Sequence, residues 1–246
     1  YGATERNGGR DEARRGLAEC VRFCKNNRRA LVRGAVGLHA SFTVSDETIR
    51  EAGALCRELS VPMHVHVAED RADVEHARGL GYAGPLERLE QLGAIPPGSI
   101  LAHGVWLDAA QVARARELGA WLVQNPRSNA ANRVGYPSAL GKSDRVALGT
   151  DGFPADMQAE REVLAQTEDN QTSASRFDAG QRIIAEFFNA TSDIVMRSGS
   201  NVRDVVVGGR TIVRDGVLLT GDVRAITADA ERAASRLWAK MGASER

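Results

Sequence analysis

A repeated alternation of short apolar segments with amphipathic segments constrains the fold of this chain more than any other feature. The apolar segments have the length of buried β-strands and lie at residues 30–42, 62–69, 99–106, 120–126 and 145–152. The amphipathic segments have helical spacing and lie at residues 10–27, 45–60, 84–93 and 107–119. Buried strands that alternate with helices are typical of a parallel sheet whose faces are covered by helices. We therefore predict an α/β fold.

The C-terminal part of the sequence has a different pattern. Two β-branched runs, 202–207 and 211–214, flank Gly208 and Gly209. This arrangement predicts a β-hairpin, because glycine tolerates positive φ at both turn positions. A final helix is predicted at residues 228–241, and the polar stretch 167–175 is predicted to be a loop.

Charge and cysteine content exclude several classes of partner. Lys+Arg and Asp+Glu both number 32, and no basic patch stands out, so we expect no nucleic-acid partner. No apolar run reaches about 18 residues and no signal peptide is visible, so we expect no membrane partner.

Three cysteines, Cys20, Cys24 and Cys56, favour reduced, buried thiols over a metal site and predict a cytoplasmic protein. Because the sequence begins at Tyr1 and not at Met, we also expect a piece of a longer protein.

Polar side chains end all five predicted strands of the parallel sheet. They are His39, His66, His103, Asn125 and Asp151. In a β/α barrel the catalytic groups lie at the carboxyl ends of the strands, because the βα loops build that face. Five such residues in succession are hard to explain by packing alone, so this edge of the sheet is the candidate site.

The stretch "VPMHVHVAED", residues 61–70, points to metal chemistry at this edge. The imidazole of His66 is a good ligand for a divalent ion such as zinc, and Glu69 could move the proton of an activated water. A packed histidine followed by a solvated glutamate is an equally open interpretation of this motif alone. Asp151 favours the metal, because an aspartate beside an apolar strand is costly unless it is paired or coordinates an ion. For His64 we favour a packed or supporting role.

Four motifs in the order "HVHVAED", "ILAHGVWL", "LVQNPRSNAANRVGYP" and "VALGTDG" resemble the amidohydrolase superfamily. The resemblance covers nearly all of the chain and is strongest to the chlorohydrolase, guanine deaminase and adenosine-type deaminase branch. Within that branch, "GLHASFTVSD" and "NPRSNAANRVGY" resemble the SsnA-type aminohydrolases. The resemblance implies a TIM (β/α)8 barrel, of which residues 1–195 form only the C-terminal part. Residues 196–246 then hold remnant strands of a small β-sandwich and a C-terminal helix.

The resemblance also implies roles for individual residues. The implied metal ligands are His66 and Asp151, and the implied catalytic residues are Glu69, His103 and Asp151. The candidate substrate-binding residues are His39, Trp106 and Asn125, with Trp106 as an apolar wall for a ring. Gln124 stands where the family motif usually has histidine. The implied cofactor is one divalent metal, zinc before iron, and the implied partners are a small-molecule substrate and a second copy in a homodimer.

Two departures from the family pattern leave two functions open. No HxH pair precedes His39, and no "PGxxADL" segment follows Asp151. The first function is a metal-dependent hydrolase acting on a carbon–nitrogen bond that is not a peptide bond, of the deaminase type. The alternative is a catalytically incomplete barrel fragment that binds a ligand or partner without metal. Without two of four ligands, we expect this chain alone to lose most of its metal affinity.

Overall fold

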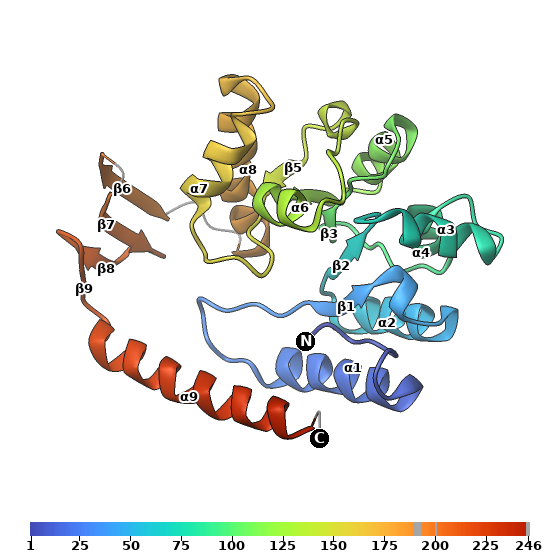
Figure 1. The fold of residues 1–246 in the computed structure, drawn as a ribbon, viewed down its shortest axis with the longest axis horizontal. Helices are drawn as coiled ribbons and strands as arrows, with labels where there is room; N and C mark the ends of the chain where they lie inside the picture. The colour runs from blue at the N-terminus through green and yellow to red at the C-terminus, as the bar shows by residue number, and fades with distance from the viewer. Residues whose placement is uncertain (189–192, 200, 245–246) are drawn as a thin grey trace. The chain divides into compact units, whose positions relative to one another are not determined.

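The structure, a computed structural model, describes residues 1–188, 193–199 and 201–244. It divides into two compact units, Tyr1–Asn189 and Ala190–Arg246. The first unit contains a parallel sheet whose strands follow one another in chain order (Figure 1). The strands are β1 (Val36–Ala40), β2 (Met63–Val67), β3 (Ile100–His103), β4 (Trp121–Gln124) and β5 (Val146–Leu148). The five predicted strands of the sheet are therefore confirmed.

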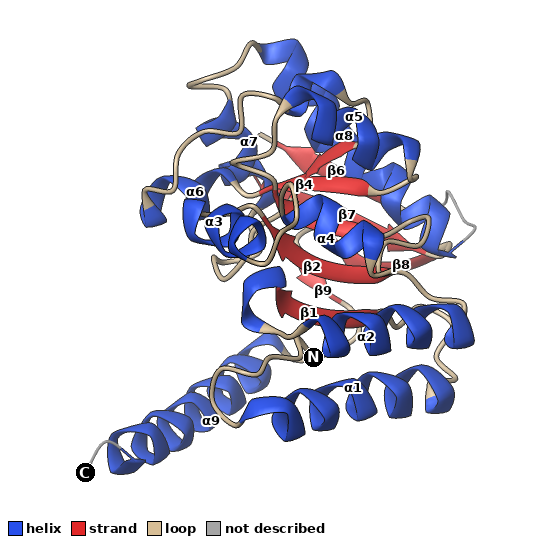
Figure 2. Cartoon of the chain, turned by 90° about the vertical axis from the view of Figure 1, so that its right-hand side faces the viewer, coloured by secondary structure: helices blue, strands red, loops and turns tan. Residues whose placement is uncertain are grey.

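Helices connect these strands and flank the sheet (Figure 2). They are α1 (Gly9–Asn26), α2 (Asp46–Leu59), α3 (Arg71–Gly79), α4 (Pro85–Gln91), α5 (Ala109–Glu117), α6 (Pro126–Asn132), α7 (Met157–Leu164) and α8 (Asn170–Phe188). Short 3-10 turns lie at Ser41–Thr43 and Leu140–Lys142. None of the helices in the described part of the chain has the length and hydropathy of a membrane-spanning segment.

Strand β2, which lies between β1 and β3, shows why the site lies where it does. Its side chains alternate, and Met63, Val65 and Val67 are fully buried in the main hydrophobic core. His64 and His66 therefore project from the opposite face of the sheet. Beside β1, Ala3 adds one more parallel bridge, since its backbone N–H donates to the carbonyl of Gly37 over 2.9 Å.

A buried arginine fixes the chain segment that follows β1. Arg88 of α4 donates from Nη1 to the carbonyl oxygen of Ser41 (2.6 Å) and from Nη2 to that of Val44 (2.9 Å). Its Nε donates to Asp46 over 2.9 Å. Ser45 is the N-cap of α2, because its hydroxyl accepts the Thr48 backbone N–H.

The second unit is built around an antiparallel sheet. Its elements are β6 (Ile194–Ser198), β7 (Asn201–Val207), β8 (Arg210–Arg214), β9 (Val217–Leu218) and α9 (Val223–Ser244). Strands β7 and β8 pair across Gly208 and Gly209, whose φ values are 56° and 78°. The predicted hairpin is confirmed, and the predicted final helix is longer than its sequence pattern indicated.

The predicted loop at residues 167–175 is wrong, because α8 begins at Asn170. Asp169 accepts the Thr172 backbone N–H over 2.7 Å and so caps the helix. The buried residues of α8 are Ser173, Arg176 and Ala179, which carry no large apolar side chain. The helix therefore has too weak an apolar stripe at its start to be recognised from hydrophobic periodicity.

Candidate metal centre and active site

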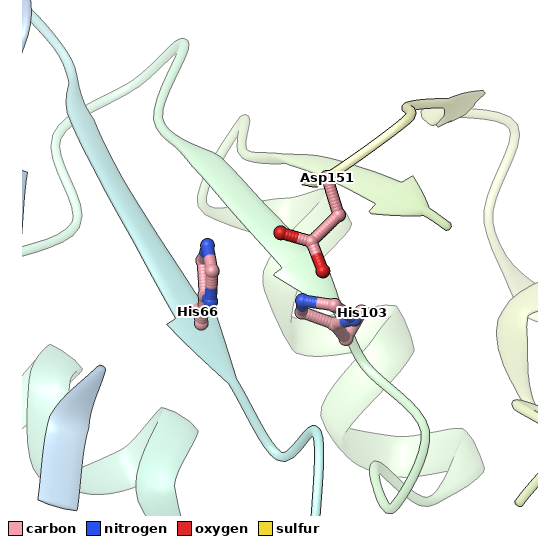
Figure 3. A group of neighbouring side chains, drawn as sticks. All are labelled: His66, His103 and Asp151. Atoms are coloured by element: carbon pink, nitrogen blue, oxygen red, sulfur yellow. The ribbon is translucent and has the colours of Figure 1, made fainter. Parts of the chain in front are cut away.

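Three side chains of metal-ligating type converge at the carboxyl edge of the parallel sheet. His66 comes from β2, His103 is the last residue of β3, and Asp151 follows β5 by three residues. One ligand atom from each side chain lies within 4.8 Å of the others, and the three point toward one another in Figure 3. The expected proximity of His66 and Asp151 is confirmed. His103, which was predicted as a catalytic residue and not as a ligand, joins the same group.

Strained backbone marks the same edge. Ala68, His103 and Asp151 have φ values of 51°, 73° and 48°, in the left-handed region that residues other than glycine rarely adopt. Each such conformation costs about 1–3 kcal/mol and persists only where the surroundings enforce it. The clustering of three such residues at the ends of β2, β3 and β5 marks this edge as the candidate functional site.

His66 is held in its neutral form. Burial, and after it the nearby ring of His103, lower the pKa of its imidazole to about 4. The centroids of these two rings are 4.8 Å apart and their planes meet nearly edge to face. Since a histidine must be unprotonated to bind a metal, His66 is ready to act as a ligand at neutral pH.

Asp151 is held in its ionised form. Burial raises its pKa, but the hydrogen bond from Ser128 and the neighbouring rings of His103 and His66 outweigh burial, so the net pKa is below the usual value. The Ser128 hydroxyl donates to Oδ2 over 2.5 Å. This bond leaves the other carboxylate oxygen of Asp151 available to a cation.

His103 is fully buried and is held by two asparagines. Its Nδ1 lies 2.8 Å from Oδ1 of Asn129. The amide nitrogen of Asn125 lies 3.3 Å from Nδ1 and 3.4 Å from Nε2. The predicted site residue Asn125 therefore touches the cluster through His103.

Glu69 lies beside the two histidines without a hydrogen bond to either. Its Oε2 is 3.6 Å from Nε2 of His103 and 3.9 Å from Nδ1 of His66. Its Oε1 accepts a hydrogen bond from Asn132 over 3.3 Å. The carboxylate is 27% exposed, so it can meet both a substrate and the cluster.

The short helix α6 supplies side chains that the sequence analysis did not single out. Asn129 holds His103, Ser128 holds Asp151, and Asn132 holds Glu69. Asn125 and Asn129 are four residues apart, as are Ser128 and Asn132, so each pair lies on one helical face. The spacing of polar residues in "NPRSNAAN" was the available signal for this helix.

The remaining predicted site residues are His39 and Trp106. The His39 ring lies 5.8 Å from the His66 ring, and both line a cavity of about 510 Å³ together with His64. Trp106 instead donates from Nε1 to the carbonyl of Val134 (3.0 Å) and carries the Arg71 guanidinium 4.3 Å above its ring.

Residues 3–191 match the sequence profile of the Amidohydrolase family. The chain belongs to this family. A 5'-deoxyadenosine deaminase of Methanoregula boonei is 34% identical over 140 residues, which cover 55% of this chain and 31% of that protein. A 5'-deoxyadenosine deaminase of Methanothermobacter thermautotrophicus is 27% identical over 270 residues, covering 92% of this chain and 62% of that protein.

A solved structure shows the same fold. It is an adenosine deaminase from Xanthomonas campestris with bound zinc, with a TM-score of 0.76 and 21% sequence identity. The match covers 94% of this chain and 63% of that chain. This amidohydrolase therefore spans less than two thirds of the proteins it matches. The predicted superfamily and the predicted fold class, part of a (β/α) barrel, are confirmed.

Proposed function

We propose that this amidohydrolase chain is part of a metal-dependent hydrolase that removes an amino group from a small, ring-containing molecule. The carrying observation is the convergence of His66, His103 and Asp151 within 4.8 Å at the strained edge of the sheet. The names of the two deaminases it is similar to support a nucleoside-like substrate, in which the broken bond joins carbon to an exocyclic nitrogen.

The donor set fits a catalytic zinc ion. Two imidazoles and one carboxylate are ligands that zinc prefers, and three protein ligands leave a position open. His66 and Asp151 would hold the ion, with His103 presenting a ring nitrogen to the same point. When bound, zinc supplies Lewis-acid chemistry that lowers the pKa of water to about 7. Iron is the alternative metal, since imidazole and carboxylate suit it as well.

Glu69 is the proposed proton carrier of this site. Its carboxylate lies within 3.9 Å of both histidines but forms a hydrogen bond with neither. It is therefore available to take a proton from water and give it to the leaving nitrogen. The Asn132 amide orients it by donating to Oε1. This arrangement separates proton transfer from metal binding.

The substrate is proposed to enter from the cavity that His39 and His66 line. Asn125 carries an amide within reach of His103 and is proposed to hydrogen-bond the substrate near the reacting carbon. Trp106 is 36% exposed, and one face of its indole is proposed to stack on the substrate ring. The Arg71 guanidinium packs on the other face of the indole.

The replacement of Glu69 by glutamine in the full-length protein tests this proposal. Glu69→Gln keeps the shape but removes the proton acceptor, and general acid–base groups contribute about 10²–10⁴-fold. We expect unchanged metal content and a loss of at least about a hundredfold in kcat for ammonia release from 5'-deoxyadenosine. The matched control is Glu75→Gln, an exposed carboxylate on α3, which should retain full turnover. Near-normal turnover by Glu69→Gln at equal metal content would remove Glu69 from the mechanism.

A further inference from the structure

Asn129 stands out as a buried residue whose amide is only half used. It is 4% exposed, and its Oδ1 lies 2.8 Å from Nδ1 of His103. Its Nδ2 is a buried side-chain nitrogen without a hydrogen-bond partner in the described part of the chain. A buried donor left unpaired is costly, so the orientation of this amide calls for a physical reason.

The contact with His103 supplies that reason. An amide oxygen only accepts hydrogen bonds, so the 2.8 Å contact requires a proton on Nδ1 of His103. The neutral ring then carries a lone pair on Nε2. This nitrogen lies on the side of the ring that faces Glu69, 3.6 Å from its Oε2.

The opposite arrangement would disable the ring. If the Asn129 amide were reversed, its NH2 group would donate to Nδ1, and the proton of His103 would move to Nε2. The ring could then neither ligate a metal nor accept a proton through Nε2. The Asn125 amide does not decide between the two states, because it lies almost equally far from both nitrogens, at 3.3 and 3.4 Å.

The Glu69 carboxylate favours the Nε2–H tautomer of His103, but it is too distant to outweigh the Asn129 contact. A carboxylate favours a proton on the nitrogen that faces it, which here is Nε2. At 3.6 Å, however, that pair lies beyond hydrogen-bonding distance, whereas the Asn129 contact at 2.8 Å is a full hydrogen bond.

We propose that Asn129 is a positioning residue that fixes His103 as its Nδ1–H tautomer and so keeps Nε2 an acceptor at the cluster. Partners of this kind set the tautomer and orientation of histidines in metal sites. The part of this inference that concerns zinc rests on the proposed function, whereas the tautomer itself does not.

The test is the tautomer of His103 in the metal-free 246-residue chain with ¹⁵N-labelled histidine. Long-range ¹H–¹⁵N spectra at alkaline pH report which ring nitrogen carries the proton, and His103→Gln assigns the signals. We expect the Nδ1–H form in the wild-type chain and in Asn129→Asp, because a carboxylate also only accepts. In Asn129→Leu the Nε2–H population should rise. The exposed His76 of α3 should keep its signals in every variant.

Zinc affinity of the full-length protein, measured by competition with a chelator, provides the second readout. Asn129→Leu should bind zinc about 10–100-fold more weakly, the usual effect of removing such a partner, and Asn129→Asp should not. An Nε2–H wild-type ring, or an unchanged tautomer in Asn129→Leu, would overturn the inference. If Asn129→Leu fails to fold, the wild-type and Asn129→Asp spectra still decide. An Nδ1–H ring together with a full-length protein that binds no zinc would defeat the proposed metal role and leave the positioning role standing.

Discussion

Replacing Arg88 by methionine should destabilise the first unit severely. Arg88 is 1% exposed, and it donates to the carbonyls of Ser41 and Val44 and to the carboxylate of Asp46. Methionine keeps an unbranched, apolar side chain but removes every donor. The carbonyls of Ser41 and Val44, which lie between β1 and α2, then lose the Arg88 donors, whereas Asp46 keeps its hydrogen bond from Tyr82.

The size of the effect follows from the burial of those acceptors. Ser41 and Val44 are 0% and 4% exposed, and each unpaired buried carbonyl costs about 1–3 kcal/mol. Asp46 is 26% exposed and regains water, so it adds less. The two carbonyls set the scale of the loss, which we expect to be about 2–6 kcal/mol. Domain stability is only about 5–15 kcal/mol, so the loss is a large fraction of the total.

Urea unfolding followed by tryptophan fluorescence measures this loss, since Trp121 is fully buried in the first unit. Arg114→Met is the matched control, because Arg114 pairs with Glu90 and Glu117 but is 47% exposed. Exposed ion pairs contribute little, so the control should unfold at nearly the wild-type urea concentration. A loss of stability in Arg88→Met no larger than that in Arg114→Met would contradict the importance assigned to the buried Arg88 donors.

Three further predictions concern the site and the hairpin. His66 takes up a proton at pH about 6.5 in the unfolded chain but only at about 4 in the folded chain. The free energy of unfolding should therefore decrease as the pH is lowered from about 6.5 to about 4. His66→Gln should flatten this dependence in acid titrations of stability. Ser128→Ala should raise the pKa of Asp151, measured by carboxyl ¹³C NMR, because the hydroxyl lowers it; an unchanged pKa would contradict the assigned hydrogen bond. Gly209→Val should cost about 1–2 kcal/mol, because Gly209 has φ 78°, and should speed hydrogen exchange in β7 and β8. Unchanged exchange would contradict the turn geometry.

Strand alternation explains how much of the site the sequence could predict. In β2, Met63, Val65 and Val67 face the core, which sends His66 to the other face at the strand end. Parallel strands share one carboxyl edge, so strand ends as distant in sequence as His66 and Asp151 could be placed together. Both regularities follow from the alternation of apolar and polar residues along the strands, which can be read from the sequence alone.

Contacts between polar groups from different strand–helix units could not be predicted in this way. Asn129 meets His103 across 26 residues, and Arg176 of α8 donates to Gln124 across 52. Both pairs depend on how the helices pack against the sheet. The polar side chains involved belong to no apolar stripe, so hydrophobic periodicity does not predict their positions. No sequence pattern indicated that the Trp106 indole would donate to the carbonyl of Val134, 28 residues away.

Zinc binding by the purified full-length protein is the decisive measurement for the site. We expect zinc to bind in competition with a chelator and His66→Ala to abolish this binding. His64→Ala is the matched control, because His64 lies two residues away on the same face of β2 but outside the ligand cluster. It should bind zinc as the wild type does. Equal binding by wild type and His66→Ala, or equal loss in His64→Ala, would contradict a metal centre at His66, His103 and Asp151.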